Sequence, residues 1–201
     1  FYPGSMDESY AAPIEDSMFE GVRLCVITLA PRKDNQEFFE KCKKHHIPIA
    51  FGMKDDFDAF PEEFLKTLLT ESEIIFSNEV ERGIMEELFQ LKDITELFQI
   101  GKAKVIVTTL GKDGSLCYTY DGTEVREEKI GICKVEQVVD ATGSGDAYIS
   151  GFVYGYLNGY GAKDCCKLGS ALSSFVLQKE GCCTNLPTEQ ELLGKAGLER
   201  V

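Results

Sequence analysis

The sequence predicts an α/β fold in which a mostly parallel sheet is covered by helices. Short apolar runs alternate with amphipathic segments from Gly21 to about Thr109. This alternation is typical of parallel strands, because parallel neighbours need a crossover connection, usually a helix. With 201 residues, 43% of them hydrophobic, the chain can bury a sizeable core. We expect a single domain covering residues 1–201.

The first half of the chain is expected to supply four strands and three helices. The strands are the apolar runs at residues 24–29, 47–51, 73–76 and 104–109. The helices follow the first three strands, at about residues 34–45, 61–69 and 78–88. Asp34 or Asn35 can cap the first helix, and Pro61 suits the first turn of the second.

The pattern changes after Gly111. Short antiparallel strands are expected at residues 115–120, 123–128 and 134–139. Asp121-Gly122 predicts a tight hairpin between the first two. Three helices then close the chain at about residues 143–158, 162–179 and 188–195.

Composition argues against several classes of partner. The net charge of −13 disfavours nucleic acids and anionic membrane surfaces. No apolar run reaches the ~20 residues that cross a bilayer. The first residues lack the basic region of a signal peptide, so we expect a cytoplasmic protein. Because the chain opens on Phe1 without an initiator Met, we also expect it to be cut from a longer protein.

Eight cysteines invite a metal or disulfide interpretation, but their spacing disfavours a zinc site. No C-x-x-C occurs, and two pairs are vicinal, which is a poor geometry for tetrahedral coordination. Several lie in apolar strand-like runs, where a thiol behaves as a small hydrophobe. We expect reduced, structural cysteines in a reducing compartment. They are Cys25, Cys42, Cys117, Cys133, Cys165, Cys166, Cys182 and Cys183.

Residues 139–147, Val-Asp-Ala-Thr-Gly-Ser-Gly-Asp-Ala, are the most informative stretch. The small residues Gly143, Ser144 and Gly145 let the backbone approach a ligand closely, and the apolar segment after them predicts a helix start. The N–H groups and the dipole of a helix start suit a phosphate or a developing oxyanion. Asp146 stands where an attacking hydroxyl would meet a bound phosphoryl group. A glycine-rich turn with Asp146 as a helix cap is the alternative.

This stretch resembles the signature of the ribokinase-like (PfkB) carbohydrate kinase family, and other motifs follow in the family's order. Residues 77–81, Ser-Asn-Glu-Val-Glu, resemble its N-x-x-E motif, and residues 107–114 resemble its V-T-L-G-x-x-G strand and turn. Residues 169–174 with Gly181-Cys182 resemble the small-residue helix that closes over the adenine. The resemblance covers nearly the whole chain from about residue 24.

The resemblance implies a three-layer α/β/α sandwich that transfers the γ-phosphate of ATP to a hydroxymethyl group of a sugar. In such a transfer the protein aligns the hydroxyl and neutralises charge on the phosphoryl oxygens. Backbone N–H groups of Gly143, Ser144 and Gly145 suit the second task, and Asp146 suits the first as catalytic base. The family's N-terminal lid portion is missing, and residues 1–20 resemble a remnant of it.

Five residues are candidates for binding the nucleotide. Asn78 stands at the carboxyl end of a predicted strand, where open α/β sheets bind ligands. Thr109 and Gly111 end the next strand, where a hydroxyl and an open backbone can meet ATP phosphates. Gly114 permits the tight turn that follows. Ser170 matches by spacing a family position that often bears a polar adenine contact.

Three residues are candidates for binding ions. Glu81 lies one helical turn after Asn78, and its carboxylate suits Mg²⁺, directly or through water. A helix cap and a solvated glutamate are the alternative for this pair. Asp140 and Thr142 match positions of a monovalent-cation site in some family members, which makes K⁺ a second candidate ion.

Three functional hypotheses follow. The first is a kinase of small-molecule sugars. The second is an adenosine-type nucleoside kinase, encouraged by residues 1–4 (Phe-Tyr-Pro-Gly) and 182–185 (Cys-Cys-Thr-Asn). The third is a nucleotide-binding fragment with impaired catalysis, because the lid is missing. A sheet edge left open by the missing strands makes a homodimer a candidate assembly.

Three other patterns carry no site. Gly151, Gly155 and Gly159 share one helix face, which indicates close packing against a neighbouring helix. His45 and His46 end a predicted helix, where positive charge suits the dipole. No G-x-x-x-x-G-K-[ST] occurs, which excludes a P-loop kinase.

Overall fold

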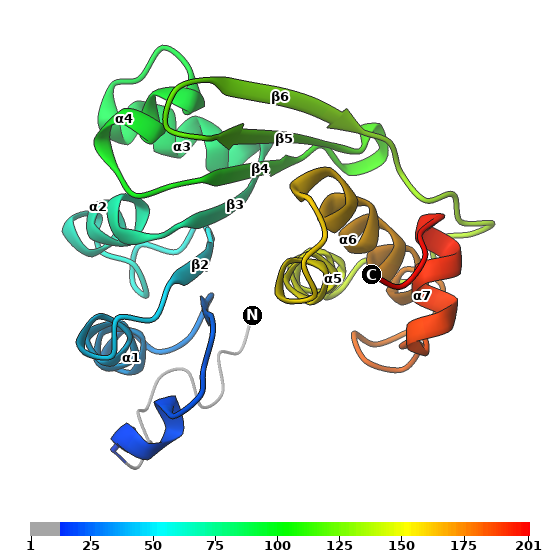
Figure 1. Cartoon of the computed structure of the whole chain (residues 1–201), viewed down its shortest axis with the longest axis horizontal. Helices are drawn as coiled ribbons and strands as arrows, with labels where there is room; N and C mark the ends of the chain where they lie inside the picture. The colour runs from blue at the N-terminus through cyan, green and yellow to red at the C-terminus, as the bar shows by residue number, and fades with distance from the viewer. Residues whose placement is uncertain (1–12) are drawn as a thin grey trace. The chain divides into compact units, whose positions relative to one another are not determined.

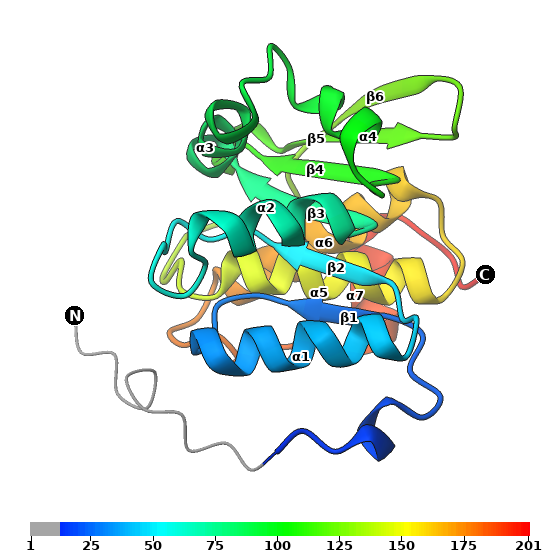
Figure 2. The same cartoon turned by 90° about the vertical axis from the view of Figure 1, so that its left-hand side faces the viewer.

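Strands β1 to β6 form a six-stranded sheet in which each strand lies beside its neighbours in the chain (Figures 1 and 2). β1 pairs with β2 and β2 with β3 in parallel, whereas β5 and β6 are antiparallel. This mostly parallel sheet and its helices confirm the predicted three-layer α/β fold. The strands are β1 (Cys25–Ile27), β2 (Ile49–Gly52), β3 (Ile74–Asn78), β4 (Val105–Thr109), β5 (Ser115–Tyr120) and β6 (Val125–Ile130).

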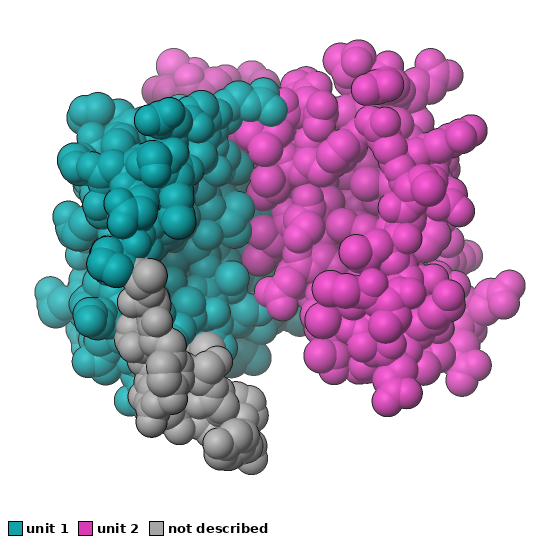
Figure 3. All heavy atoms as spheres, turned by 90° about the horizontal axis from the view of Figure 1, so that it is seen from below, with its two compact units in different colours: residues 1–106 teal, residues 107–201 magenta. Residues whose placement is uncertain are grey.

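The computed structural model describes residues 13–201 and separates into two compact units, which meet in the chain within β4. The first unit ends at Ile106, and the second runs from Val107 to Val201 (Figure 3). Among the described residues, no helix is both long enough and apolar enough to span a membrane.

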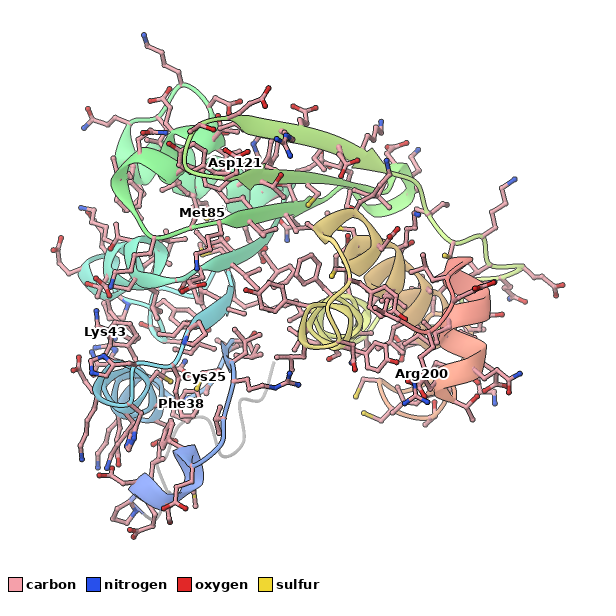
Figure 4. The ribbon with its side chains drawn as sticks, viewed as in Figure 1. Cys25, Phe38, Lys43, Met85, Asp121 and Arg200 are labelled. Atoms are coloured by element: carbon pink, nitrogen blue, oxygen red, sulfur yellow. The ribbon has the colours of Figure 1, made fainter. Side chains whose placement is uncertain are left out.

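In the first unit the helices pack on the strands that precede them. α1 (Arg32–Lys44) packs against β1, and α2 (Glu62–Glu71) packs against β2. Their buried faces carry Phe39 and Cys42 on α1 and three leucines on α2, as the amphipathic periodicity predicts. Cys25, labelled in Figure 4, and Cys42 are both buried where β1 and α1 pack together. α3 (Glu79–Phe89) follows β3, and the short α4 (Leu97–Ile100) contacts α2.

The start of α1 differs from the predicted one. The helix begins at Arg32 after Pro31, and neither Asp34 nor Asn35 caps it. The buried Asn35 side chain donates instead to the carbonyls of Thr28 (3.1 Å) and Ala30 (3.2 Å). Asn35, in the first turn of α1, therefore holds the loop between β1 and α1 in place.

Residues 1–12 of the expected lid remnant lie outside the described residues. Asp16–Phe19, within the same predicted segment, form a short 3₁₀ helix. Phe19 stacks on His45 at the end of α1, with ring centroids 5.1 Å apart. Asp16 forms ion pairs with Lys41 and Lys44 of α1. This part of the N-terminal segment is therefore anchored on α1.

In the second unit β5 and β6 form the predicted hairpin, but β6 begins at Val125 instead of residue 123. Asp121, labelled in Figure 4, accepts the N–H groups of Thr123 and Glu124, both at 3.0 Å. These bonds, with that of the Thr123 hydroxyl foremost, lower the pKa of Asp121 to about 2. The turn thus uses residues 121–124, and the second strand starts after them.

The strand predicted at residues 134–139 is wrong. After β6 the chain runs without regular secondary structure to the start of α5 (Ser144–Leu157). Its backbone groups form hydrogen bonds to residues of the last two helices of the chain and to the residue that ends the first of these two. The Cys133 N–H donates to Ser170, the Lys134 carbonyl accepts from Lys195, and the Val139 N–H donates to the Leu177 carbonyl. We call residues 131–139 the connecting segment.

Three helices complete the second unit. α5 lies beside α6 (Ala162–Val176), which packs on β5, β6 and α7 (Glu189–Ala196) (Figure 1). A Cβ on Gly151 would lie 2.5 Å from the Leu168 carbonyl oxygen, and one on Gly155 would lie 2.7 Å from a Leu168 methyl. Close helix packing is confirmed for these two glycines. Nothing lies within 4 Å of a Cβ on Gly159, so this third glycine does not share that role.

The eight cysteines, all within the described residues, are free thiols. Five are buried and Cys133 is half-buried, whereas Cys182 and Cys183 are exposed. Among residues 13–201, no group of three His, Cys, Asp or Glu side chains is arranged to hold a metal ion.

Candidate active site

The start of α5 is built around Gly143. This residue is the N-cap of the helix and has a left-handed backbone with φ 76°, which favours glycine. A Cβ here would lie 2.4 Å from the Cβ of Cys182, so the contact also excludes a side chain. The Gly143 carbonyl accepts the first helical hydrogen bond, from the Ala147 N–H at 2.8 Å. The contact with Cys182 accounts for a glycine at this position, and the close approach of the backbone to a ligand stays a prediction.

Asp146 lies in the first turn of α5, three residues after the N-cap, and its side chain is exposed. Ser144 and Gly145 precede it in the same turn. No side-chain cap bonds to this end of the helix. Since the first-turn N–H groups of a helix lack intrahelical acceptors and the dipole is positive there, an anion is stabilised beside Asp146.

A cavity of about 390 Å³ opens in the second unit next to this helix start. It brings together six of the residues predicted to act on the nucleotide: Thr109, Gly111, Gly114, Ser144, Gly145 and Ser170. The cavity walls do not include Gly143, Asp146, Asp140 or Thr142. The volume lies within the range of small-molecule sites.

The apolar part of the cavity was missed by the sequence analysis. Its walls include Ile132, Val135 and Val138 from the connecting segment and Leu177 from the end of α6. Both valines lie in the segment 134–139 that was expected to form a strand, which hid their role. Apolar walls with a few polar groups are typical of small-molecule sites, where the polar groups orient the ligand.

The turn after β4 supplies a second polar part of the cavity wall, in addition to the start of α5. Gly111–Asp113 form a short 3₁₀ helix, and the Leu110 N–H donates to the Gly114 carbonyl at 2.8 Å. Gly114 has φ 92°, and a Cβ there would lie 2.0 Å from the Ile130 carbonyl oxygen. The tight turn predicted at Gly114 is therefore present, and only glycine fits it.

The Ser170 hydroxyl holds the connecting segment. It accepts the Cys133 N–H at 2.9 Å and donates to the Gly131 carbonyl at 3.4 Å. Ser170 therefore fixes the position of the cavity wall at Ile132, in addition to lining the cavity itself.

Tyr148 lines the cavity from the second turn of α5. Its side chain is 6% exposed, and its hydroxyl is 2.7 Å from that of Ser115 on β5. Burial raises the pKa of Tyr148 well above its usual range, so the phenol stays neutral. The sequence offered no signal for this residue beyond its place in an apolar helix.

Asp140 links the loop before α5 to the turn after α6 by hydrogen bonds, an arrangement that we call the Asp140 clasp. Its carboxylate oxygens accept the N–H groups of Gly181 (3.0 Å) and Thr142 (2.8 Å). These bonds, that of Gly181 first, lower the pKa of Asp140 below its usual value. Asp140 and Thr142, predicted to hold a monovalent ion, are thus neighbours in one tight loop, and the carboxylate has a structural role there.

Asn78 and Glu81 belong to the first unit and form a reciprocal capping box at the start of α3. The Glu81 N–H donates to the Asn78 side chain at 2.9 Å, and the Asn78 N–H donates to the Glu81 carboxylate at 2.7 Å. Glu81 is 8% exposed. The helix-cap alternative for this pair is therefore present in the structure, and the roles in binding nucleotide and Mg²⁺ stay predictions.

Comparison with known proteins identifies the family of the chain. Residues 10–189 match the pfkB family carbohydrate kinase. A nucleoside kinase of Methanocaldococcus jannaschii is 31% identical over 170 residues, which are 82% of this chain and 53% of that protein. A 5-dehydro-2-deoxygluconokinase of Bacillus cereus is 32% identical over 165 residues, 76% of this chain and 48% of that protein. The chain spans about half the length of the curated relatives it matches.

Solved structures agree on the fold. The crystal structure of the Methanocaldococcus jannaschii nucleoside kinase, an archaeal member of the ribokinase family, superposes with a TM-score of 0.76 at 25% identity. The match covers 90% of this chain and 60% of that one. A Burkholderia thailandensis nucleoside kinase in complex with inosine gives a TM-score of 0.78 at 20% identity, over 88% of this chain and 57% of that one. The second likeness concerns the fold alone.

Proposed function

Since the chain belongs to the pfkB family of carbohydrate kinases, we propose that it is an ATP-dependent phosphotransferase whose acceptor is a hydroxymethyl group of a sugar. The observation that carries the proposal is the start of α5. An uncapped helix start with Ser144 and Gly145 opens on a cavity, and an acidic side chain follows in the same turn.

Each part of the cavity suits a part of ATP. The apolar walls at Ile132, Val138 and Leu177 suit the base, and the polar wall at Thr109 and Gly111 suits the phosphates. The chain has a net charge of −13, so local positive potential has to come from backbone N–H groups and from Lys112, which also lines the cavity.

Two groups on α5 perform the chemistry in this proposal. Backbone N–H groups around Gly145 stabilise charge on the transferred phosphoryl group, with Gly143 setting their position. The Ser144 N–H already donates to the Ala141 carbonyl at 3.2 Å, so Ser144 contributes chiefly by lining the cavity. Asp146 accepts the proton of the attacking hydroxyl. A carboxylate is a weak base, but phosphoryl transfer through a loose transition state asks little of its base, because most of the catalysis is alignment and charge stabilisation.

Two ions belong to the proposal. Mg²⁺ would neutralise phosphate charge when bound, and the Glu81 carboxylate would be its one protein ligand in this proposal, because a carboxylate oxygen is the kind of ligand this ion prefers. The Glu81 carboxylate also accepts the capping bond from the Asn78 N–H. Asp140 and Thr142 offer oxygen atoms to K⁺, although both Asp140 oxygens already accept backbone N–H groups.

A nucleoside is the second candidate acceptor. Relatives from Methanocaldococcus jannaschii and Thermococcus kodakarensis are named nucleoside kinase and cytidine kinase. A nucleoside presents a hydroxymethyl group on ribose, so the same chemistry at Asp146 serves both acceptors.

The proposal also places the protein in the cytoplasm, where its eight free thiols stay reduced.

A phosphotransfer assay with panels of sugars and nucleosides tests the proposal, run on this chain and on any longer parent protein. Nucleotide binding by calorimetry on the same samples separates the outcomes. Turnover with one panel identifies the acceptor class. Nucleotide binding without turnover in either protein would indicate a binding fragment, and absence of both binding and turnover would refute the proposal.

A further inference from the structure

Two neighbouring thiols, those of Cys182 and Cys183, lie beside the start of α5, where Cys182 contacts Gly143. Cys182 and Cys183 are the exposed cysteines of the chain, and their sulfur atoms are 3.8 Å apart. The other six thiols are buried or half-buried. A reagent in solution therefore meets this pair first.

The pair contacts the residue on which the helix start depends. The Cβ of Cys182 lies 2.4 Å, and its Cα 3.3 Å, from the position of a Cβ on Gly143. No space remains for a side chain at Gly143 beside Cys182. Any movement of Cys182 toward or away from this contact is therefore felt at the N-cap of α5.

The turn that carries the pair is fixed on both sides. The Gly181 N–H donates to Asp140 at 3.0 Å, and the Asn185 side chain donates to the Phe175 carbonyl at 2.6 Å. The Thr184 hydroxyl donates to the Glu180 carbonyl, also at 2.6 Å. Because the flanking residues are held, a change of geometry at 182–183 falls mainly on the two cysteines.

We propose that Cys182 and Cys183 are a reversible oxidation site for peroxides, and that their disulfide disturbs the start of α5. One cysteine sulfur attacks a peroxide oxygen, the O–O bond breaks, and a sulfenic acid forms with release of water or alcohol. The second sulfur then attacks the sulfenic sulfur, an S–S bond forms, and water leaves. The two thiols are oxidised, and the peroxide is reduced.

Ring closure between neighbours forces the backbone to change. Consecutive Cα atoms across a trans peptide are about 3.8 Å apart, whereas most disulfides join Cα atoms roughly 4.4–6.8 Å apart. The disulfide is therefore strained, and strained, exposed disulfides are the ones that cellular thiols reduce readily. The same strain moves Cys182 against Gly143.

The test uses the full chain and reads the two parts of the proposal separately. The protein is treated with hydrogen peroxide, then alkylated and mapped by mass spectrometry. We expect the peptide with both cysteines to lose two hydrogen atoms before other thiols react, and dithiothreitol to restore them. Oxidation of buried thiols first, or sulfonic acid without a disulfide at this pair, would overturn the assignment of the site.

Hydrogen exchange of residues 139–147 reports on the start of α5 and does not depend on the proposed kinase activity. We expect several-fold faster exchange after oxidation of the wild type, with a several-fold loss of nucleotide affinity where nucleotide binds. Cys183→Ser is the matched variant, because it cannot close the ring and leaves the Cys182 contact with Gly143 intact. Unchanged exchange in the oxidised wild type, or equal acceleration in Cys183→Ser, would refute the coupling to α5.

Discussion

The starts of α3 and α5 have an acidic residue at the same position but use it differently. At α3 the N-cap is Asn78 and Glu81 follows three residues later, and the two side chains bond reciprocally to the backbone. α7 repeats this arrangement with Thr188 and Glu191. At α5 the corresponding N-cap is Gly143, which has no side chain, and the acid is Asp146. The first two helix ends are closed by their own side chains, and the third has no side-chain cap.

An acidic residue three positions after the N-cap can therefore serve helix stability in one helix and be available for function in another. A capping box satisfies orphan N–H groups and stabilises its helix, typically by about 1 kcal/mol. Glycine at the N-cap gives up the side-chain bond and leaves the end of the helix able to receive an external anion. An acid beside an uncapped helix start is therefore a better candidate for chemistry than an acid within a capping box.

The largest expected effect is that of Asp146→Asn. Loss of a general base typically lowers turnover by ~10²–10⁴-fold, and the amide keeps the size of the side chain. Nucleotide affinity should stay close to that of the wild type. Steady-state kinetics with calorimetric titration of an ATP analogue measure both quantities, in a parent protein with demonstrated activity.

Glu191→Gln provides the matched control, because it changes the acid at the same position of α7. It should lower thermal stability slightly and leave turnover unchanged. Similar losses of turnover in the two variants would show that the acid after the N-cap serves helix stability in both places.

The second prediction concerns the residue that leaves α5 uncapped. Gly143→Ala forces a side chain into a left-handed conformation, which costs about 1–3 kcal/mol, and places its Cβ 2.4 Å from that of Cys182. We expect the free energy of unfolding, measured in urea, to fall by at least this amount. Adding Cys182→Gly should recover the part due to the clash. Full stability in the single variant would contradict the described geometry.

Asn78→Ala tests the opposite case at α3. Removal of an N-cap side chain costs about 0.5–2 kcal/mol, so the melting temperature should fall while phosphotransfer that depends on Asp146 continues.

Glu81→Gln keeps a side-chain acceptor for the Asn78 N–H, so we expect it to lower the melting temperature less than Asn78→Ala does. If Glu81 also holds Mg²⁺, this variant raises the Mg²⁺ concentration needed for half-maximal turnover. An unchanged Mg²⁺ requirement would restrict Glu81 to the cap.

The smallest effect is expected from acid titration of Asp140. Its native pKa lies below the usual value of about 3.9 because the Gly181 and Thr142 N–H groups favour the carboxylate. A lowered native pKa adds stability above the unfolded value, and this stability is lost as pH falls through the native pKa. In Asp140→Asn the fall in melting temperature between pH 6 and roughly pH 3 should be smaller. An identical fall in the two proteins would show that the clasp contributes nothing.

Most elements of the fold could be predicted because their signals are local. The apolar runs of β2, β3 and β4 and the periodicity of α2 and α6 place these elements within a few residues. The connecting segment could not be predicted, because its valine-rich sequence suits a strand equally well. Its partners are Ser170, Lys195 and Leu177, which lie 37 or more residues later in the chain. Only tertiary contacts decide such a case.

The candidate site shows the same division. Gly143, Ser144, Gly145 and Asp146 are contiguous, so a motif could indicate them together. Asn78 and Glu81 also follow a motif, but sequence could not decide between a cap and a ligand site, because both uses need the same spacing. Tyr148 was missed because its burial comes from β5 as well as from its own helix.

The glycine contact between α5 and α6 gives the candidate site a distant foundation. Gly151 lies eight residues beyond Gly143, roughly 12 Å along the helix at 1.5 Å per residue. There the backbones touch so closely that neither helix can slide or roll without a collision. α5 is therefore held against α6 both at Gly151 and at its first turn, where the Ser173 hydroxyl donates to the Ser144 carbonyl at 2.5 Å. An alanine at Gly151 would push the two helices apart and displace the first turn with Asp146, so the accuracy of the site is determined in part by a residue outside the cavity wall.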